Sequence, residues 1–129
     1  MGIVKLGYFG LSMGSIFGIA LIASRTDVTV ATLGLVGVQS NYPHDKERLE
    51  AAGKIDCPLL FLMQLEDELF TREGYLQVFD TFKSRDKRIN ANPGLHPEIP
   101  AEENDFSFDF LLSNIRGNVT RRIINPLAE

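Results

Sequence analysis

The hydrophobic pattern of the chain alternates between strand-like and helix-like segments. Short apolar runs rich in β-branched and aromatic residues predict strands at residues 3–9, 28–38, 58–64 and, with a weaker pattern, 87–91. Helices are predicted at residues 12–24, in a short solvated segment within 41–52, from 71 to about 83, and in a last segment that ends near Gly117. This alternation is typical of an α/β fold with a parallel sheet of about four strands flanked by helices on both faces.

The polarity of individual faces refines this prediction. Segment 12–24 is apolar on nearly every side, which predicts a helix buried between layers. Strand 28–38 shows no polar alternation, which predicts burial on both of its faces. Apolar residues at a period near 3.6 predict the core faces of the last two helices. These residues are Tyr75, Leu76, Phe79 and Phe82 in one helix, and Phe108, Leu111, Leu112 and Ile115 in the other.

Composition and charge limit the class of protein. The 129 residues, 44% hydrophobic and 23% charged, are typical of a single domain over 1–129, with residues 118–129 as a peripheral tail. The net charge of −4, with Lys and Arg scattered, gives no electrostatic footprint for nucleic acid or an anionic membrane. The single cysteine, Cys57, excludes an internal disulfide, and no His/Cys cluster has metal-ligand spacing. We therefore expect a cytoplasmic protein without a metal or cofactor.

The N-terminus also allows a different interpretation. Lys5 followed by the apolar residues 6–23 resembles a secretory signal peptide, whose removal would delete Ser12. Four glycines and two serines dilute this stretch, and it contains no uninterrupted run of about 18 apolar residues. A membrane span is therefore not expected, and a secreted protein remains an alternative.

A pentapeptide at the first strand-to-helix junction carries the strongest chemical signal. Residues 10–14 form the G-x-S-x-G pattern of a nucleophile elbow, in which a sharp turn exposes the serine Oγ. Ser12 is the candidate nucleophile, and the backbone N–H of Met13 is the candidate oxyanion donor. Glycines are expected at both ends of the pattern because the strand and helix backbones approach closely there. Cys57 precedes a proline without such a turn and is interpreted as a core thiol.

A serine nucleophile needs a general base, and the chain has two histidines. His96 lies in a turn after the fourth predicted strand, at the sheet edge where the sites of α/β proteins gather. His44 lies in a charged helical stretch, which is typical of a solvated side chain. His96 is therefore the candidate base.

An acidic run after the third predicted strand offers the carboxylate that would orient the base. Glu66, Asp67 and Glu68 are consecutive. Successive side chains of a strand point in opposite directions, so we expect at most one register of this run, either Asp67 or its two neighbours, to face His96. Asp67 is preferred because Ser12, Asp67 and His96 each follow a different strand, in the chain order of α/β-hydrolases.

These motifs resemble the dienelactone hydrolase-like branch of the α/β-hydrolase family. The resemblance spans residues 3 to about 115 and rests on residues 10–14, 55–70 and 92–100. It implies that Ser12, Asp67 and His96 form a catalytic triad that hydrolyses small carboxylic esters or thioesters. Dienelactone hydrolases proper carry cysteine at the position of Ser12, so this chain resembles a serine esterase more than a lactone hydrolase.

The resemblance further implies that the chain corresponds to the C-terminal half of the family fold. The other half supplies the second oxyanion donor and much of the substrate pocket, so weak activity is expected. A truncated sheet leaves the outer edge of strand 3–9 unpaired, and we expect a homodimer through that edge. The alternative is a non-catalytic hydrolase remnant that acts as a self-associating or interaction module.

Overall fold

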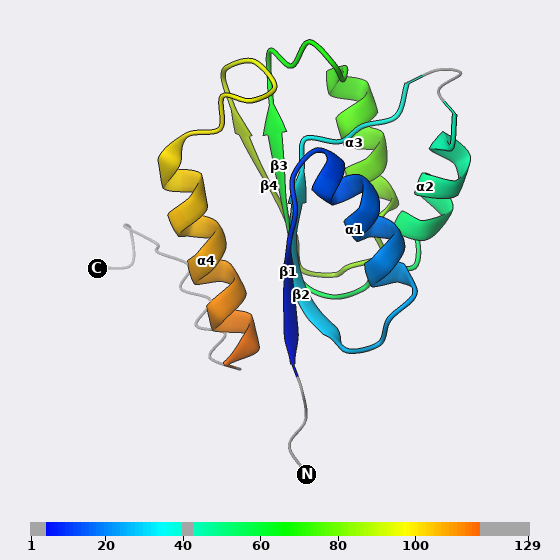
Figure 1. The fold of residues 1–129 in the computed structure, drawn as a ribbon, viewed down its shortest axis with the longest axis vertical. Coiled ribbons are helices and arrows are strands. Elements are labelled where there is room, and N and C mark those ends of the chain that lie inside the picture. Colours follow the sequence, from blue (N-terminus) through cyan, green and yellow to red (C-terminus); the bar gives the residue numbers. More distant parts are fainter. Residues whose placement is uncertain (1–4, 40–42, 117–129) are drawn as a thin grey trace, which may run out of the picture.

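A computed structural model describes residues 5–39 and 43–116 and shows a four-stranded parallel sheet with helices on both faces (Figure 1). The strands are β1 (Leu6–Phe9), β2 (Val28–Gly34), β3 (Leu59–Gln64) and β4 (Lys87–Asn92). The helices are α1 (Met13–Ala23), α2 (Asp45–Ala52), α3 (Arg72–Thr81) and α4 (Ala101–Ile115). The predicted fold class is confirmed.

The strands lie in the sheet in the order in which they occur in the chain, β1-β2-β3-β4, and each neighbouring pair is parallel. Parallel crossovers are right-handed, so a steady advance in one direction across the sheet places α1, α2 and α3 on one face. Helix α4 follows the last strand and covers the other face (Figure 1). The strand order places β1 at one edge of the sheet, and the parallel pairing places the carboxyl ends of all four strands on the same side.

Two apolar clusters hold the layers together. The larger one lies between the sheet and helices α1 to α3, and in it the buried rings of Phe61 and Tyr75 meet edge to face with centroids 6.1 Å apart. The smaller one lies between the sheet and α4 and comprises Val30, Leu60, Leu62, Phe110 and Leu111. Strand β3 contributes to both clusters and is buried along its whole length, as expected of a central strand covered on both faces.

The second strand is shorter than predicted. Strand β2 ends at Gly34, and the prediction that it reaches Val38 is wrong because Leu35 adopts a left-handed backbone with φ 53°. Residues 36–38 then pass beside the first turn of α3, where the Val38 N–H donates to the Gly74 carbonyl at 3.2 Å. These residues remain buried, which explains why the apolar pattern continues past the end of the strand.

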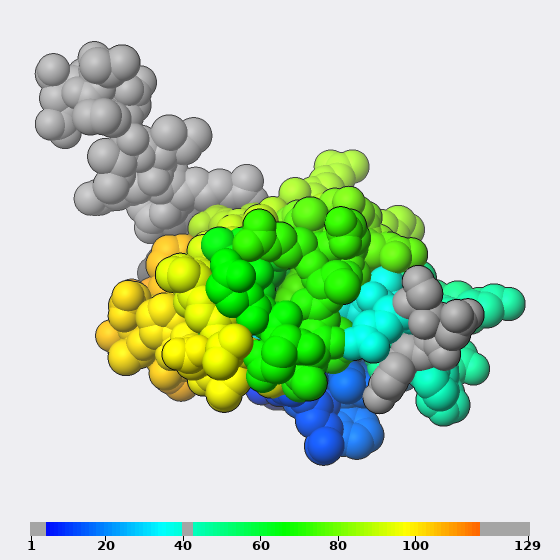
Figure 2. Space-filling view, turned by 90° about the horizontal axis from the view of Figure 1, so that it is seen from above, coloured from blue at the N-terminus to red at the C-terminus, as the bar shows by residue number. Residues whose placement is uncertain are grey.

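Helix α1 is more exposed than its apolar sequence predicts. Ile19 and Ile22 face the sheet and are buried, whereas Met13, Phe17 and Leu21 are exposed. Figure 2 shows α1, in blue, projecting from one side of the molecule. The prediction of a helix buried between layers is wrong because β1 is an edge strand and no described element packs against that side of α1.

The core faces of α3 and α4 also differ in part from the prediction. Leu76 of α3 is exposed, and so are Phe108 and Leu112 of α4. The buried residues of α4 are Glu103, Ser107, Phe110 and Leu111. Two of these four are polar, so a pattern of apolar residues alone assigns the helix face incorrectly.

Some predictions fall outside the described residues. These are the first two residues of strand 3–9, the helix end at Gly117 and the peripheral tail 118–129. Within the part of the chain that is described, no helix is long and apolar enough to cross a membrane.

Candidate active site

Ser12 stands in a sharp turn between β1 and α1. Its backbone has φ 57° and ψ −117°, a costly conformation for a residue with a side chain. The N–H groups of Gly10 and Ser12 donate to the carbonyls of Thr32 at 3.0 Å and Gly34 at 2.9 Å, so the end of β2 holds the turn. The turn places Ser12 at the carboxyl edge of the sheet, where a nucleophile elbow is expected.

The two glycines of the pentapeptide have different surroundings. A Cβ at Gly10 would lie 2.6 Å from the Gly14 carbonyl oxygen and 2.7 Å from a ring carbon of Tyr8, so a side chain does not fit there. A Cβ at Gly14 would meet no described atom within 4 Å. The expected close approach of the strand and helix backbones is confirmed, since the Gly14 carbonyl is what a side chain at Gly10 would meet. This approach excludes a side chain at Gly10 but not at Gly14.

Ser15 braces the elbow from inside and was not among the predicted site residues. Its buried hydroxyl lies 2.7 Å from the Gly10 carbonyl oxygen and 2.6 Å from the Gly34 carbonyl oxygen, and it accepts the Gly34 N–H at 2.7 Å. A single side chain therefore ties the elbow to the end of β2. The sequence signal that could have found Ser15 is a serine on the buried face of an apolar helix, because a buried hydroxyl needs a hydrogen-bond partner.

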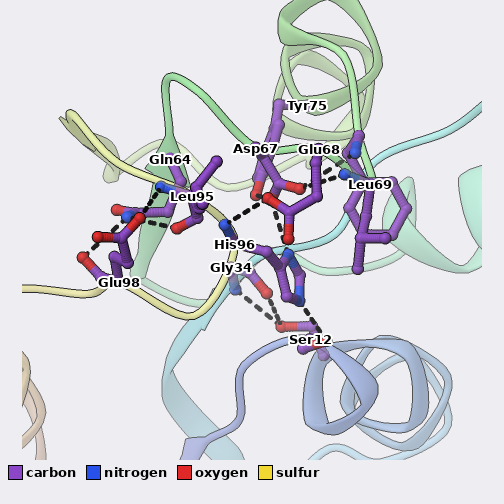
Figure 3. Close-up of polar contacts among 12 residues, drawn as sticks. Ser12, Gly34, Gln64, Asp67, Glu68, Leu69, Tyr75, Leu95, His96 and Glu98 are labelled. Atoms are coloured by element: carbon purple, nitrogen blue, oxygen red, sulfur yellow. Dashed lines mark hydrogen bonds and ion pairs between the residues drawn. The ribbon is translucent and has the colours of Figure 1, made fainter.

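The structure brings the three predicted residues into one hydrogen-bonded chain (Figure 3). Ser12 Oγ lies 2.8 Å from His96 Nε2, and His96 Nδ1 lies 2.7 Å from Asp67 Oδ2. The carboxylate requires Nδ1 to carry the ring proton, so Nε2 is left free to accept the proton of the Ser12 hydroxyl. His44 takes no part in this chain, since it is exposed and its Nδ1 lies 2.8 Å from Glu47 Oε2.

The Asp67 carboxylate is held by four donors. Its Oδ1 accepts the backbone N–H groups of Leu69 at 2.7 Å and Phe70 at 3.2 Å, and its Oδ2 accepts the hydroxyl of buried Tyr75 as well as His96. Burial raises the pKa of Asp67, but the hydrogen bonds from Tyr75, His96 and Leu69 outweigh it and hold the pKa below its usual range. Burial and the contact with Asp67 raise the pKa of Tyr75, so its hydroxyl stays a donor.

The other two acids of the run have different roles. Glu68 Oε2 accepts the backbone N–H of His96 at 3.0 Å, while exposed Glu66 pairs with Arg72 at 3.2 Å. Within the run, Asp67 contacts the imidazole ring and Glu68 contacts the main chain of the same residue, so two consecutive side chains reach His96. The prediction that at most one register faces His96 is wrong, because the run lies in a turn beyond the end of β3. Glu68 fixes the main chain that carries the ring.

Gln64 joins the loop of the base to the loop of the acid. Like Ser15, it is not among the residues that the sequence predicts for the site. It is the last residue of β3 and is buried, and its Nε2 donates to the carbonyls of Leu95 at 3.0 Å and Glu98 at 2.9 Å (Figure 3). These two carbonyls flank His96. Because the loop with Asp67 begins directly after Gln64, this side chain ties the loop of the base to the start of the loop of the acid.

Gln64→Leu is expected to loosen this arrangement without emptying the space that the side chain fills. The substitution removes two hydrogen bonds and takes this donor from the Glu98 carbonyl, whereas the Leu95 carbonyl still accepts the Glu98 N–H at 3.0 Å. The expected cost is about 1–3 kcal/mol in the free energy of unfolding. Urea unfolding of Gln64→Leu, with exposed Gln77→Leu as the matched control, measures this cost. Equal midpoints for the two variants would show that Gln64 does not hold the loop.

The stability of the folded chain is expected to depend on pH through Asp67. A carboxyl whose pKa is lower in the folded chain contributes stability above the pKa of the unfolded carboxyl, about 3.9, and this stability is lost as the pH falls through the folded pKa. Asp67→Asn is therefore expected to flatten the fall of the unfolding free energy below about pH 4. Urea titrations across this range, with exposed Asp80→Asn as the control, test it; parallel curves for Asp67→Asn and wild type would contradict it.

Cys57 does not compete with Ser12 as a nucleophile. It is buried beside β3, and burial raises the pKa of its thiol to about 11. Almost no reactive thiolate exists at neutral pH at such a pKa, which agrees with the interpretation of a core thiol. Among residues 5–39 and 43–116, no group of three or more His, Cys, Asp or Glu side chains is placed to hold a metal ion.

Comparison with known proteins gives matches among solved structures only. No protein-family model matches the chain, and no curated protein sequence does. A cold-adapted esterase from an Arctic intertidal metagenomic library is 33% identical with a TM-score of 0.71, and the match covers 81% of this chain and 49% of the esterase. The chain thus spans about half the length of that esterase.

More distant structures share the fold. An esterase from Pyrococcus furiosus is 15% identical with a TM-score of 0.69, over 87% of this chain and 54% of the esterase. A monoacylglycerol lipase from Paleococcus ferrophilus is 16% identical with a TM-score of 0.63, over 87% of this chain and 68% of the lipase. At these identities the likeness concerns the arrangement of strands and helices alone.

Proposed function

We propose that this chain, which has a truncated α/β-hydrolase-like fold, is a serine hydrolase that cleaves carboxylic esters or thioesters. The observation that carries the proposal is the hydrogen-bonded chain from Ser12 Oγ through His96 to Asp67, at 2.8 Å and 2.7 Å. The elbow conformation of Ser12 and the 33% identity to a cold-adapted esterase support the same reaction class.

The reaction follows from the direction of these hydrogen bonds. Ser12 Oγ attacks the acyl carbon while His96 Nε2 takes the hydroxyl proton, and Asp67 stabilises the imidazolium that forms. His96 then returns the proton to the leaving alcohol or thiol, which breaks the old ester bond and leaves an acyl group on Ser12. Water then attacks the acyl carbon with His96 as the base, which releases the carboxylic acid and restores the Ser12 hydroxyl.

One donor for the oxyanion comes from the start of α1. The Met13 N–H belongs to the first residue of the helix, and the first N–H groups of a helix have no acceptor within it. The helix dipole adds favourable positive potential at the same point. Loss of a single oxyanion donor typically lowers kcat by a factor on the order of 10² to 10³, so the half-fold is a slow catalyst if Met13 acts alone.

Three motifs and the single cysteine support a proposed substrate class and cellular compartment. We assign the chain to the dienelactone hydrolase-like branch on the three motifs around Ser12, Asp67 and His96, with esters preferred to lactones because the nucleophile is serine. The raised pKa of the Cys57 thiol leaves it inert, and a cytoplasmic setting fits a single buried thiol. Small activated esters are the expected substrates.

Labelling with a fluorophosphonate tests the proposal directly. A serine activated by His96 is expected to form one covalent adduct, visible as a single mass increase and located by peptide mapping on the segment that contains Ser12. A folded chain that stays unmodified would instead support a non-catalytic remnant that works as an interaction module. Circular dichroism on the same sample separates that outcome from misfolding.

A further inference from the structure

An apolar surface is exposed on the open side of the sheet. On α1 it contains Met13 and Phe17, both 66% exposed, and Leu21, 43% exposed. Phe9 at the end of β1, 40% exposed, stacks on Phe108 of α4 with ring centroids 5.9 Å apart. The edge surface is defined as Phe9, Met13, Phe17, Leu21, Phe108 and Leu112, and it flanks a strand edge.

The backbone between these side chains is also open. β1 pairs with β2 on one side, and on its other side no described strand pairs with it. An edge of this kind presents N–H and C=O groups to any further strand. Gly14 adds space for a close approach, since a Cβ there would meet no described atom within 4 Å.

We propose that the edge surface binds a second copy of this chain, with the two β1 strands antiparallel across a two-fold axis. An axis perpendicular to the sheet keeps each helix layer on its own side, so α1 meets the α1 of the partner and α4 meets its α4. The two sheets then form one continuous sheet. The inference stands on the fold and does not depend on the chemistry of Ser12.

The pattern of α1 fits this symmetry. A two-fold interface requires a surface that is complementary to itself. The exposed apolar residues of α1 lie four positions apart and are symmetric about Phe17, so Phe17 meets the partner's Phe17 and Met13 meets the partner's Leu21. Helix α1 has no charged residue in a chain that is 23% charged, so no like charges meet across the axis in this layer.

The available area agrees with a dimer. Six large side chains that each expose about half of their roughly 150–200 Å² give on the order of 500 Å² of apolar surface per copy. That value is near the upper end for the largest apolar patch of a monomer, about 300–600 Å². A standard interface buries roughly 800 Å² per partner, so this apolar surface would supply more than half of that area, and the open backbone of β1 adds to it.

Light scattering after size exclusion tests the proposal on the 129-residue chain. The wild type is expected to have twice the mass of one chain at tens of micromolar, and Phe17→Glu to have the mass of one, because two carboxylates would meet at the axis. Leu76→Glu is the matched control, an exposed leucine on α3 that is not part of the edge surface, and it is expected to stay dimeric. A monomeric wild type overturns the proposal and leaves another segment or protein as the occupant.

A cysteine at the axis gives a second, independent measurement. Phe17→Cys is expected to form an intermolecular disulfide under mild oxidation, because position 17 meets itself, whereas Leu76→Cys is not; the natural Cys57 is buried. Higher oligomers, or a dimer in which Phe17→Cys fails to crosslink, would overturn the two-fold arrangement. Activity is not measured in either experiment, so failure here leaves the proposed hydrolase reaction untouched.

Discussion

Ser12→Ala is expected to abolish fluorophosphonate labelling and to reduce hydrolysis of p-nitrophenyl acetate to the rate without protein. Loss of the nucleophile in a complete serine hydrolase lowers kcat by a factor on the order of 10⁶. The wild-type rate expected here is already low, so a smaller loss is enough to reach the rate without protein. The fold is expected to persist, because the contact of the elbow with Gly34 is made by the Ser12 backbone N–H and not by its hydroxyl.

A second serine of the same helix provides the control. Ser24 caps the end of α1, is exposed and hydrogen-bonds only within its own turn, so Ser24→Ala is expected to retain full labelling. Equal hydrolysis by Ser12→Ala and wild type would show that the nucleophile is assigned wrongly. Equal stability of the two variants in urea confirms that the comparison concerns chemistry alone.

His96→Ala is expected to lower the hydrolysis rate about as much as Ser12→Ala, since nucleophile and base act as one unit. Its side chain lies in a loop beyond β4, so a smaller effect on stability is expected than on activity. His44→Ala is the matched control, because His44 is exposed and its ring contacts only Glu47 among the described hydrogen bonds. If His44→Ala were the damaging substitution, the base and the family resemblance behind it would both be wrong.

The position of the candidate site could be predicted because parallel strands bring their carboxyl ends to one edge. Ser12, Asp67 and His96 follow β1, β3 and β4, and no detail of packing is needed to place the three at that edge. The structure places them within hydrogen-bond distance, and their catalytic roles stay a prediction. The choice of Asp67 over Glu66 and Glu68 rests on the chain order Ser–Asp–His. Strand alternation could not decide it, because side chains in a loop do not alternate as they do in a strand.

The supporting residues could not be predicted in the same way. Gln64 ends an apolar strand and Tyr75 belongs to an apolar helix face, so both resemble core positions. Their function depends on which carbonyl or carboxylate the tertiary fold brings near, and no local pattern records that. The exposure of Phe17 could not be predicted for a related reason, since burial of a helix depends on neighbours outside its own segment.

The sequential strand order also bears on how the chain folds. Each parallel pair closes over one intervening helix, so the sheet can grow by successive local additions from either end. Ser12 and His96 are 84 residues apart, and their hydrogen bond connects the first strand to the last. Loops of that length close at a higher entropic cost, so this contact is expected to form late. In a refolding experiment, recovery of fluorophosphonate reactivity would then report the completion of folding, after the helical signal has already returned.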